Sequence, residues 1–142
     1  MAARFMTGYM DRALDDLAGI VEGARKDLAD VEFDTLVGTG FSGAAVVPAL
    51  ALALGKNFVL IRKESDDSHH GGGRLIGSLG DRWIFVDDFI SSGATRDRVI
   101  QKIAAAVVLH DHPTTYVGDD LYLWEGADVD EVPRWRPLET VD

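Results

Sequence analysis

One stretch of the sequence decides the fold: Trp83-Ile84-Phe85-Val86-Asp87-Asp88-Phe89-Ile90-Ser91-Ser92-Gly93-Ala94-Thr95. Its first four residues are apolar and predict a buried strand, and two carboxylates follow at the carboxyl end of that strand. The next turn is rich in hydroxyls and leads through a glycine into a helix. Because the free N–H groups and the dipole at a helix start attract anions, this turn predicts a cradle for a phosphate monoester. The two carboxylates would then accept hydrogen bonds from sugar hydroxyls.

The composition fits one globular domain. The chain has 142 residues, of which 46% are hydrophobic, and it has no cysteine. The lack of cysteine excludes disulfides and thiolate metal sites. The net charge of −10 opposes binding to nucleic acid or to anionic membranes, and no apolar run is long enough to span a bilayer. We therefore expect a cytoplasmic protein with a single domain over residues 1–142, whose core covers about 33–110 and whose C-terminal arm covers about 111–142.

Predicted strands and helices alternate along the chain. Short apolar runs predict strands at 33–37, 57–61, 82–86 and 105–109, and a further strand at 121–124. Helices are expected over about 6–29, from the glycines at 38–43 to about 55, and over about 93–104. Pro48 implies a kink or a late start in the second helix. The alternation predicts an α/β fold with a mainly parallel sheet flanked by helices, whose ligands bind at the carboxyl ends of the strands.

The stretch from Trp83 to Thr95 resembles the phosphoribosyl-pyrophosphate (PRPP) binding motif of the type I phosphoribosyltransferases, in which an apolar strand, an acidic pair and a small-residue loop end in Gly-x-Thr. The resemblance extends upstream. Thr39-Gly40-Phe41-Ser42-Gly43 is similar to the pyrophosphate loop of that family, and Arg62-Lys63 is similar to the Arg-Lys pair of its orotate and adenine members. Residues 64–74, with His69 and His70 before three glycines, resemble the mobile catalytic loop of the orotate enzymes. The resemblance covers about residues 33–106.

This resemblance implies a Rossmann-like fold with a reduced hood and a Mg²⁺-dependent transfer of 5-phosphoribosyl from PRPP to a nucleobase-like acceptor, with release of pyrophosphate. Asp87 and Asp88 would hold the ribose hydroxyls, directly or through Mg²⁺. Lys63 and either His69 or His70 would complete the catalytic set. The 5-phosphate would be bound by Ser91, Ser92, Gly93, Ala94 and Thr95, and the pyrophosphate by Thr39, Gly40, Phe41, Ser42, Gly43, Arg62 and Lys63. Members of the family commonly form homodimers, and we expect one here.

Two departures from the orotate pattern bear on the acceptor. Asp66, Asp67 and Ser68 stand where the orotate-type loop carries a lysine, and only about 32 residues precede the first core strand. These departures disfavour orotate as the acceptor. They also support an alternative function, a regulatory protein that binds PRPP without catalysis.

Three other interpretations account for fewer of these residues. Gly38-x-Gly40-x-x-Gly43 fits a dinucleotide fingerprint, but Arg62 and Lys63 stand where that fingerprint needs a carboxylate. A nucleophile elbow at Ser42, with Asp87 and His110 as partners, is broken by Ala44. The pairs His69-His70 and His110-x-His112 lack further metal ligands at suitable spacing.

Overall fold

The computed structural model describes residues 17–62, 75–87 and 93–122. The described elements are α2 (Leu17–Asp27), β1 (Thr35–Thr39), α3 (Gly40–Leu54), β2 (Asn57–Ile61), β3 (Leu75–Gly77), β4 (Arg82–Asp87), α4 (Ala94–His110), β5 (Thr115–Tyr116) and β6 (Leu121–Tyr122). None of the helices within these ranges has the length and apolar character needed to cross a membrane.

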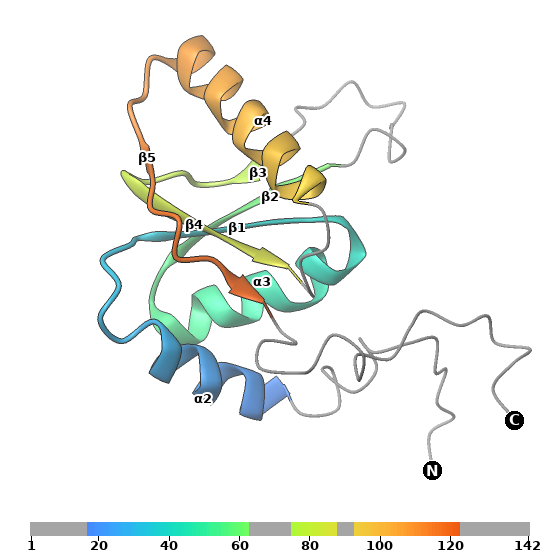
Figure 1. Ribbon diagram of the computed structural model, residues 1–142, viewed down its shortest axis with the longest axis vertical. Helices are drawn as coiled ribbons and strands as arrows, with labels where there is room; N and C mark the ends of the chain where they lie inside the picture. Colours follow the sequence, from blue (N-terminus) through green and yellow to red (C-terminus); the bar gives the residue numbers. More distant parts are fainter. Residues whose placement is uncertain (1–16, 63–74, 88–92, 123–142) are drawn as a thin grey trace, which may run out of the picture.

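The strands form a mainly parallel sheet in the order β3-β2-β1-β4-β5, and β6 also pairs with β4. β1 lies between β2 and β4 and runs parallel to both. β3 is antiparallel to β2 and occupies one edge of the sheet. Figure 1 shows three layers, with α2 and α3 below the sheet and α4 above it. The α/β architecture expected from the sequence is therefore confirmed.

The two faces of the sheet are buried by different helices, because successive residues of a strand point to opposite sides. One face packs Leu36, Ile84 and Val86 against Val46 and Leu50 of α3, and α2 joins this cluster through Ala24. The other face packs against α4. In this second cluster Val99 and Ile103 of α4 pack with five strand residues: Val37, Val59, Ile61, Trp83 and Phe85. β1 and β4 are thus buried on both faces, which explains their continuous apolar runs.

The prediction of a strand at 105–109 is wrong, because these residues belong to the C-terminal part of α4. The run Ala105–Leu109 is as apolar as a buried strand, and such short runs do not distinguish the two structures. No glycine or proline interrupts the sequence between Gly93 and Pro113, so the helix continues to His110. The next strand, β5, follows Pro113.

The other predicted elements agree with the structure where it describes them. β2 spans the predicted residues, β4 extends one residue further, and β1 lies two residues later than expected. The helix expected over 6–29 is confirmed as α2 over Leu17–Asp27, and residues 6–16 lie outside the described ranges. α3 begins at Gly40, well before Pro48, so the predicted late start of this helix is wrong. The mobile loop expected at 64–74 lies outside the described residues.

Asp34 ties together the amino ends of the strands. Its carboxylate accepts the Thr35 hydroxyl at 2.6 Å and the Asp81 N–H at 2.9 Å, and its backbone carbonyl accepts the Asn57 N–H at 2.8 Å. Burial raises the pKa of Asp34, but hydrogen bonds from Thr35 and from the Asp81 and Arg82 N–H groups outweigh it and lower the pKa overall. Asp34 therefore stabilises the amino ends of the strands. The residues predicted to bind ligands lie at the carboxyl ends.

Candidate functional site

Three strand ends meet at the carboxyl edge of the sheet, since β2, β1 and β4 are adjacent and parallel. They carry Arg62, Thr39 and Asp87 at or just beyond their last residues. The Thr39 hydroxyl is buried and donates to the Ile61 carbonyl at 2.7 Å, which fixes the end of β1 to the end of β2. The register that pairs Thr35 with Trp83 places Thr39 level with Asp87 when it is extended along both strands.

The amino end of α3 opens directly onto this edge. Gly40 is its first residue and has φ 72°, a left-handed conformation that lets the chain turn from strand to helix within one residue. Thr39 is the N-cap, but its hydroxyl is engaged with β2 and makes no capping hydrogen bond. The first N–H groups of α3 therefore have no side-chain cap within the described residues, and the positive end of the helix dipole faces the strand ends.

Close contact between two glycines holds α3 in this position. A Cβ built on Gly38 would lie 2.6 Å from Val47 Cγ2 and 3.2 Å from the Gly43 Cα. A Cβ on Gly43 would lie 3.0 Å from the Gly38 carbonyl carbon. Only glycine at both positions lets the first turn of the helix lie against β1, so the spacing Gly38-x-Gly40-x-x-Gly43 serves helix packing as well as the turn.

The amino end of α4 lies at the same edge, after β4. Gly93 is its N-cap with φ 83°, and among the described residues no side chain caps this helix. The Arg96 side chain folds back over Gly93, because a Cβ built on Gly93 would lie 3.0 Å from Arg96 Nη2. Arg96 also forms an ion pair with Asp97, with 3.7 Å between Nε and Oδ1. A cation and a helix dipole thus meet at the start of α4.

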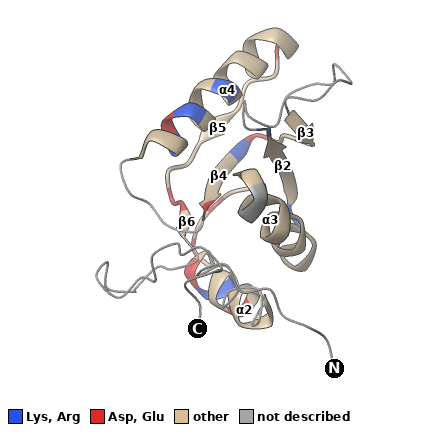
Figure 2. Cartoon of the chain, turned by 90° about the vertical axis from the view of Figure 1, so that its right-hand side faces the viewer, with Lys and Arg blue, Asp and Glu red and all other residues tan. Residues whose placement is uncertain are grey.

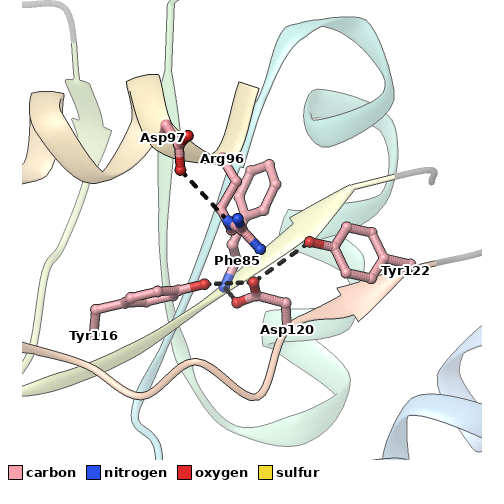
Figure 3. Close-up of polar contacts among 6 residues, drawn as sticks. All are labelled: Phe85, Arg96, Asp97, Tyr116, Asp120 and Tyr122. Atoms are coloured by element: carbon pink, nitrogen blue, oxygen red, sulfur yellow. Dashed lines mark hydrogen bonds and ion pairs between the residues drawn. The ribbon is translucent and has the colours of Figure 1, made fainter. Parts of the chain in front are cut away.

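Asp120, Tyr116 and Tyr122 lie near the start of α4, along the edge of β4 that pairs with β5 and β6 (Figure 3). Asp120 Oδ1 accepts the Phe85 N–H at 3.1 Å, and Oδ2 accepts the hydroxyl of Tyr116 and, at 3.4 Å, that of Tyr122. Arg96 extends from α4 toward the same carboxylate. The rings pack on the strand, with Tyr122 edge-on to Phe85 at a centroid separation of 6.4 Å.

Asp120 occupies a break in the edge strand. β4 advances three residues from Trp83 to Val86, whereas its partner advances five from Tyr116 to Leu121. The extra residues interrupt the ladder, and the Asp120 carboxylate replaces a backbone carbonyl opposite Phe85. Beyond the break, Tyr122 is in register with Asp87.

The surroundings of this cluster shift its ionisation. Burial raises the pKa of Asp120, and this outweighs the lowering by the Tyr116 hydroxyl, the Phe85 N–H and Arg96. Burial and then the hydrogen bond to Asp120 raise the pKa of Tyr116. Burial followed by the charge of Asp120 raises the pKa of Tyr122. Both tyrosines are therefore neutral hydrogen-bond donors at physiological pH.

The structure brings together the predicted site residues that it describes. Thr39, Gly40, Gly43, Arg62, Asp87, Gly93, Ala94 and Thr95 lie at the carboxyl edge of the sheet or in the first turns of α3 and α4. The backbones of Phe41 and Ser42 belong to the first turn of α3, and their side chains are outside the description. Six predicted residues lie outside the described ranges: Lys63, His69, His70, Asp88, Ser91 and Ser92.

Sequence reasoning did not single out Arg96, Tyr116, Asp120 or Tyr122. Asp120 acts through a break in a strand whose two parts have only two residues each, and such short elements leave no periodic pattern. The available signal was the pair of tyrosines on either side of the polar turn Gly118-Asp119-Asp120.

The nucleophile-elbow hypothesis fails on geometry. Asp87 lies at the carboxyl end of β4, whereas His110 is the last residue of α4, about 24 Å along the helix from its start beside that edge. His112 Nε2 lies 3.0 Å from the Gly80 carbonyl, at the amino end of β4. The described residues contain no group of three or more histidine or carboxylate side chains placed to hold a metal ion.

Comparison with known proteins agrees with the fold and the motif. No protein-family model matches the chain. It is 39% identical to an orotate phosphoribosyltransferase of Ralstonia pickettii over 106 residues, which make up 69% of this chain and 46% of that protein. It is 31% identical to an adenine phosphoribosyltransferase of Solibacter usitatus over 109 residues, covering 63% of this chain and 62% of that one.

A solved structure shows the same fold. The orotate phosphoribosyltransferase of Mycobacterium tuberculosis, in complex with inorganic phosphate, superposes with a TM-score of 0.51 and 20% identity over 78% of this chain and 60% of that chain. The matched part of this chain covers 36–46% of the length of three curated orotate relatives. Over 63–69% of its length the chain is therefore similar in sequence to orotate and adenine phosphoribosyltransferases, and it shares the fold of a solved orotate phosphoribosyltransferase.

Proposed function

We propose that this protein is a phosphoribosyltransferase that, with Mg²⁺, transfers 5-phosphoribosyl from PRPP to a ring nitrogen of a nucleobase-like acceptor and releases pyrophosphate. The observation that carries the proposal is the meeting of two helix starts without described side-chain caps, those of α3 and α4, at one sheet edge beside Asp87. PRPP carries a phosphate at one end of its ribose and a pyrophosphate at the other. Two separated anion cradles flanking a carboxylate match that arrangement.

Each cradle takes one end of PRPP in this proposal. The first turn of α4, with Gly93, Ala94 and Thr95, binds the 5-phosphate together with Ser91 and Ser92. The first turn of α3, from Gly40 to Gly43, binds the pyrophosphate together with Thr39, Arg62 and Lys63. Helix dipoles and backbone N–H groups are needed here because a chain of net charge −10 gives no general attraction to a polyanion.

The carboxylates take the sugar. Asp87 is half-buried at the end of β4, and Asp88 follows it in the sequence. In this proposal both carboxylates accept hydrogen bonds from the ribose hydroxyls. Mg²⁺ usually retains waters and takes one or two carboxylates plus substrate phosphates, and an adjacent aspartate pair fits that requirement. When bound, Mg²⁺ would neutralise charge on pyrophosphate and ribose oxygens.

The reaction breaks the bond between C1 of ribose and the pyrophosphate oxygen, forms a bond from C1 to the acceptor nitrogen, and releases the proton of that nitrogen. The protein stabilises the departing polyanion with the N–H groups of α3 and with Arg62 and Lys63. His69 or His70 supplies a proton or hydrogen bond to the leaving oxygen. Water must be kept from C1 while it has cationic character.

A pyrophosphate-release assay tests the proposal. PRPP and Mg²⁺ are mixed with the protein and with orotate, adenine, guanine, hypoxanthine, xanthine or uracil in turn. Release of pyrophosphate that depends on one of these bases supports the transferase. Calorimetric binding of PRPP without release for any base would instead favour a regulatory PRPP-binding protein, and the absence of PRPP binding would refute both functions.

Assembly and location belong to the same proposal. We expect a cytoplasmic homodimer, as is common in the family. Sedimentation velocity at working concentration measures the mass, and a monomer would contradict this part without affecting the assignment of the site.

A further inference from the structure

A cavity lies on the α4 face of the sheet, beside the β2–β3 edge. Its volume is about 500 Å³, within the usual range for small-molecule sites. It lies between the C-terminal half of α4, β2, β3 and the segment before β4. The lining is largely apolar, and its aliphatic side chains are Val59, Leu75, Leu79, Val107 and Leu109, with Ala105 and Ala106.

Among the described helices, α4 is the one that covers this face. α4 packs over the centre of the sheet through Val99 and Ile103, leaving its following turns to border the β2–β3 edge from one side. Alanines at 105 and 106 are too small to fill the space toward β3. Leu109, at the rim, remains 79% exposed, so the cavity is open to solvent along α4.

Cationic and imidazole groups stand at opposite ends of this apolar floor. Lys102 Nζ donates to the Arg62 carbonyl at 3.0 Å, at the carboxyl end of β2. His110 and His112 line the other end, where His112 Nε2 donates to the Gly80 carbonyl at 3.0 Å. An ammonium has three donors, so Lys102 can bind an anion while it keeps the bond to Arg62.

The charge of this region differs from that of the chain as a whole. The sequence has 24 acidic residues, yet none lies between Arg98 and His110 or between Leu75 and Gly80, and none lines the cavity. Figure 2 shows that the C-terminal half of α4 is largely uncharged. Lys102 therefore attracts an anion to this cavity, and no carboxylate among the described residues lines it.

We propose that this cavity binds a small amphipathic monoanion, with its carboxylate on Lys102 and its apolar body along Leu75, Leu79 and Leu109. The distance available along α4 from Lys102 to Leu109 is about 10 Å, which suits a medium-chain fatty carboxylate. The cavity adjoins the strand-end site at Arg62, whose carbonyl accepts from Lys102, but the proposal does not depend on the transferase activity.

Octanoate is the probe, titrated into the full chain by isothermal titration calorimetry. Lys102→Met keeps the aliphatic stem but removes the charge, and its affinity for octanoate is expected to fall at least tenfold. Arg98→Met is the matched control, because Arg98 is an exposed cation one turn earlier on α4 that does not line the cavity. Its affinity is expected to stay within twofold of the unmodified protein.

Two further measurements test the same site without relying on the folding of Lys102→Met. Ala106→Trp places a large ring in the cavity and is expected to abolish binding, and octanol, which has the same chain without the charge, is expected to bind at least tenfold more weakly. Undetectable octanoate binding would overturn the proposal. So would equal losses in the Lys102 and Arg98 variants, unchanged binding in a folded Ala106→Trp variant, or equal affinity for octanol.

Discussion

The carboxylate of Asp120 accepts the backbone N–H of Phe85 at 3.1 Å, in the place where a regular ladder would put a carbonyl. One side chain thereby joins the two short strands β5 and β6 to β4, two residues before Asp87. Asp120 also accepts hydrogen bonds from the hydroxyls of Tyr116 and Tyr122. Its loss would therefore remove the acceptor of one backbone donor and of two side-chain donors.

Asp120→Ala is therefore expected to lower the free energy of unfolding by about 1–3 kcal/mol, because the N–H of the buried Phe85 loses its acceptor. Asp119→Ala is the control, since Asp119 is its exposed neighbour, and we expect a change within about 0.5 kcal/mol. Urea unfolding of the three proteins measures both differences. Equal effects for the two variants would show that the bond to Phe85 contributes nothing to stability.

Asp34 makes stability depend on acid pH. The folded state lowers its pKa, so its contribution is complete above the pKa of the unfolded chain, about 3.9, and is lost as the pH falls through the lower, folded value. Denaturant unfolding between neutral pH and about pH 2 should therefore show a smaller acid loss in Asp34→Asn than in the unmodified protein. Asp30→Asn, at an exposed nearby position, should keep the full acid loss.

Gly38→Ala should destabilise the fold by about 1–3 kcal/mol, because the new methyl group would meet Val47 and push α3 from β1. Gly23→Ala in α2 is a matched control, since nothing lies within 4 Å of its Cβ position. That change should stabilise the protein by about 0.5–1 kcal/mol through helix propensity. Thermal unfolding distinguishes the two, and a neutral Gly38 variant would refute the close-contact argument.

Replacing Asp87 and Asp88 together by Asn should weaken PRPP binding at least tenfold while the fold is kept. The expected loss follows from removing charged acceptors for sugar hydroxyls, each worth about 1.5–3 kcal/mol. Asp81→Asn, an exposed aspartate at the opposite end of β4, should bind PRPP normally. Calorimetry with Mg²⁺ and PRPP measures both, and unchanged affinity in the double variant would remove the sugar-binding role.

A neutral base should be a better acceptor than orotate. Orotate adds a carboxylate to a site that holds PRPP, in a protein with Asp66 and Asp67 where the orotate-type loop carries a lysine and with a net charge of −10. Like charges close together in a poorly screened site cost on the order of 1 kcal/mol or more per pair. Comparing kcat/KM for orotate with that for adenine, guanine and uracil tests this, and fastest turnover of orotate would contradict it.

The sequence predicted the parts of the fold that repeat along the chain. The central strands β1, β2 and β4 have continuous apolar runs, because both faces of the sheet are covered, and each was placed within two residues. Ala105–Leu109 was misassigned since the same apolar run suits a helix that packs on the sheet.

At the site, the motif predicted Asp87 and Gly93 at one strand end and Thr39 at its neighbour, because parallel strands bring their carboxyl ends together. The neighbourhood of Asp120 was not predictable in this way. Its partners Phe85, Tyr116 and Tyr122 depend on where a ladder breaks, and that is set by three-dimensional register and not by a local pattern.

In the described part of the sheet, the edge strands are shorter than the central strands, and this difference in length affects the tendency to aggregate. One margin is β3, of three residues, ending at Gly77 with φ 120°, where the backbone departs from an extended conformation. The other margin consists of β5 and β6, of two residues each, separated by the break at Asp120. Long, regular edges would expose rows of backbone donors and acceptors to neighbouring molecules. Among the described residues, the five- and six-residue strands lie inside the sheet, and the described margins offer a neighbouring molecule only short stretches for intermolecular pairing.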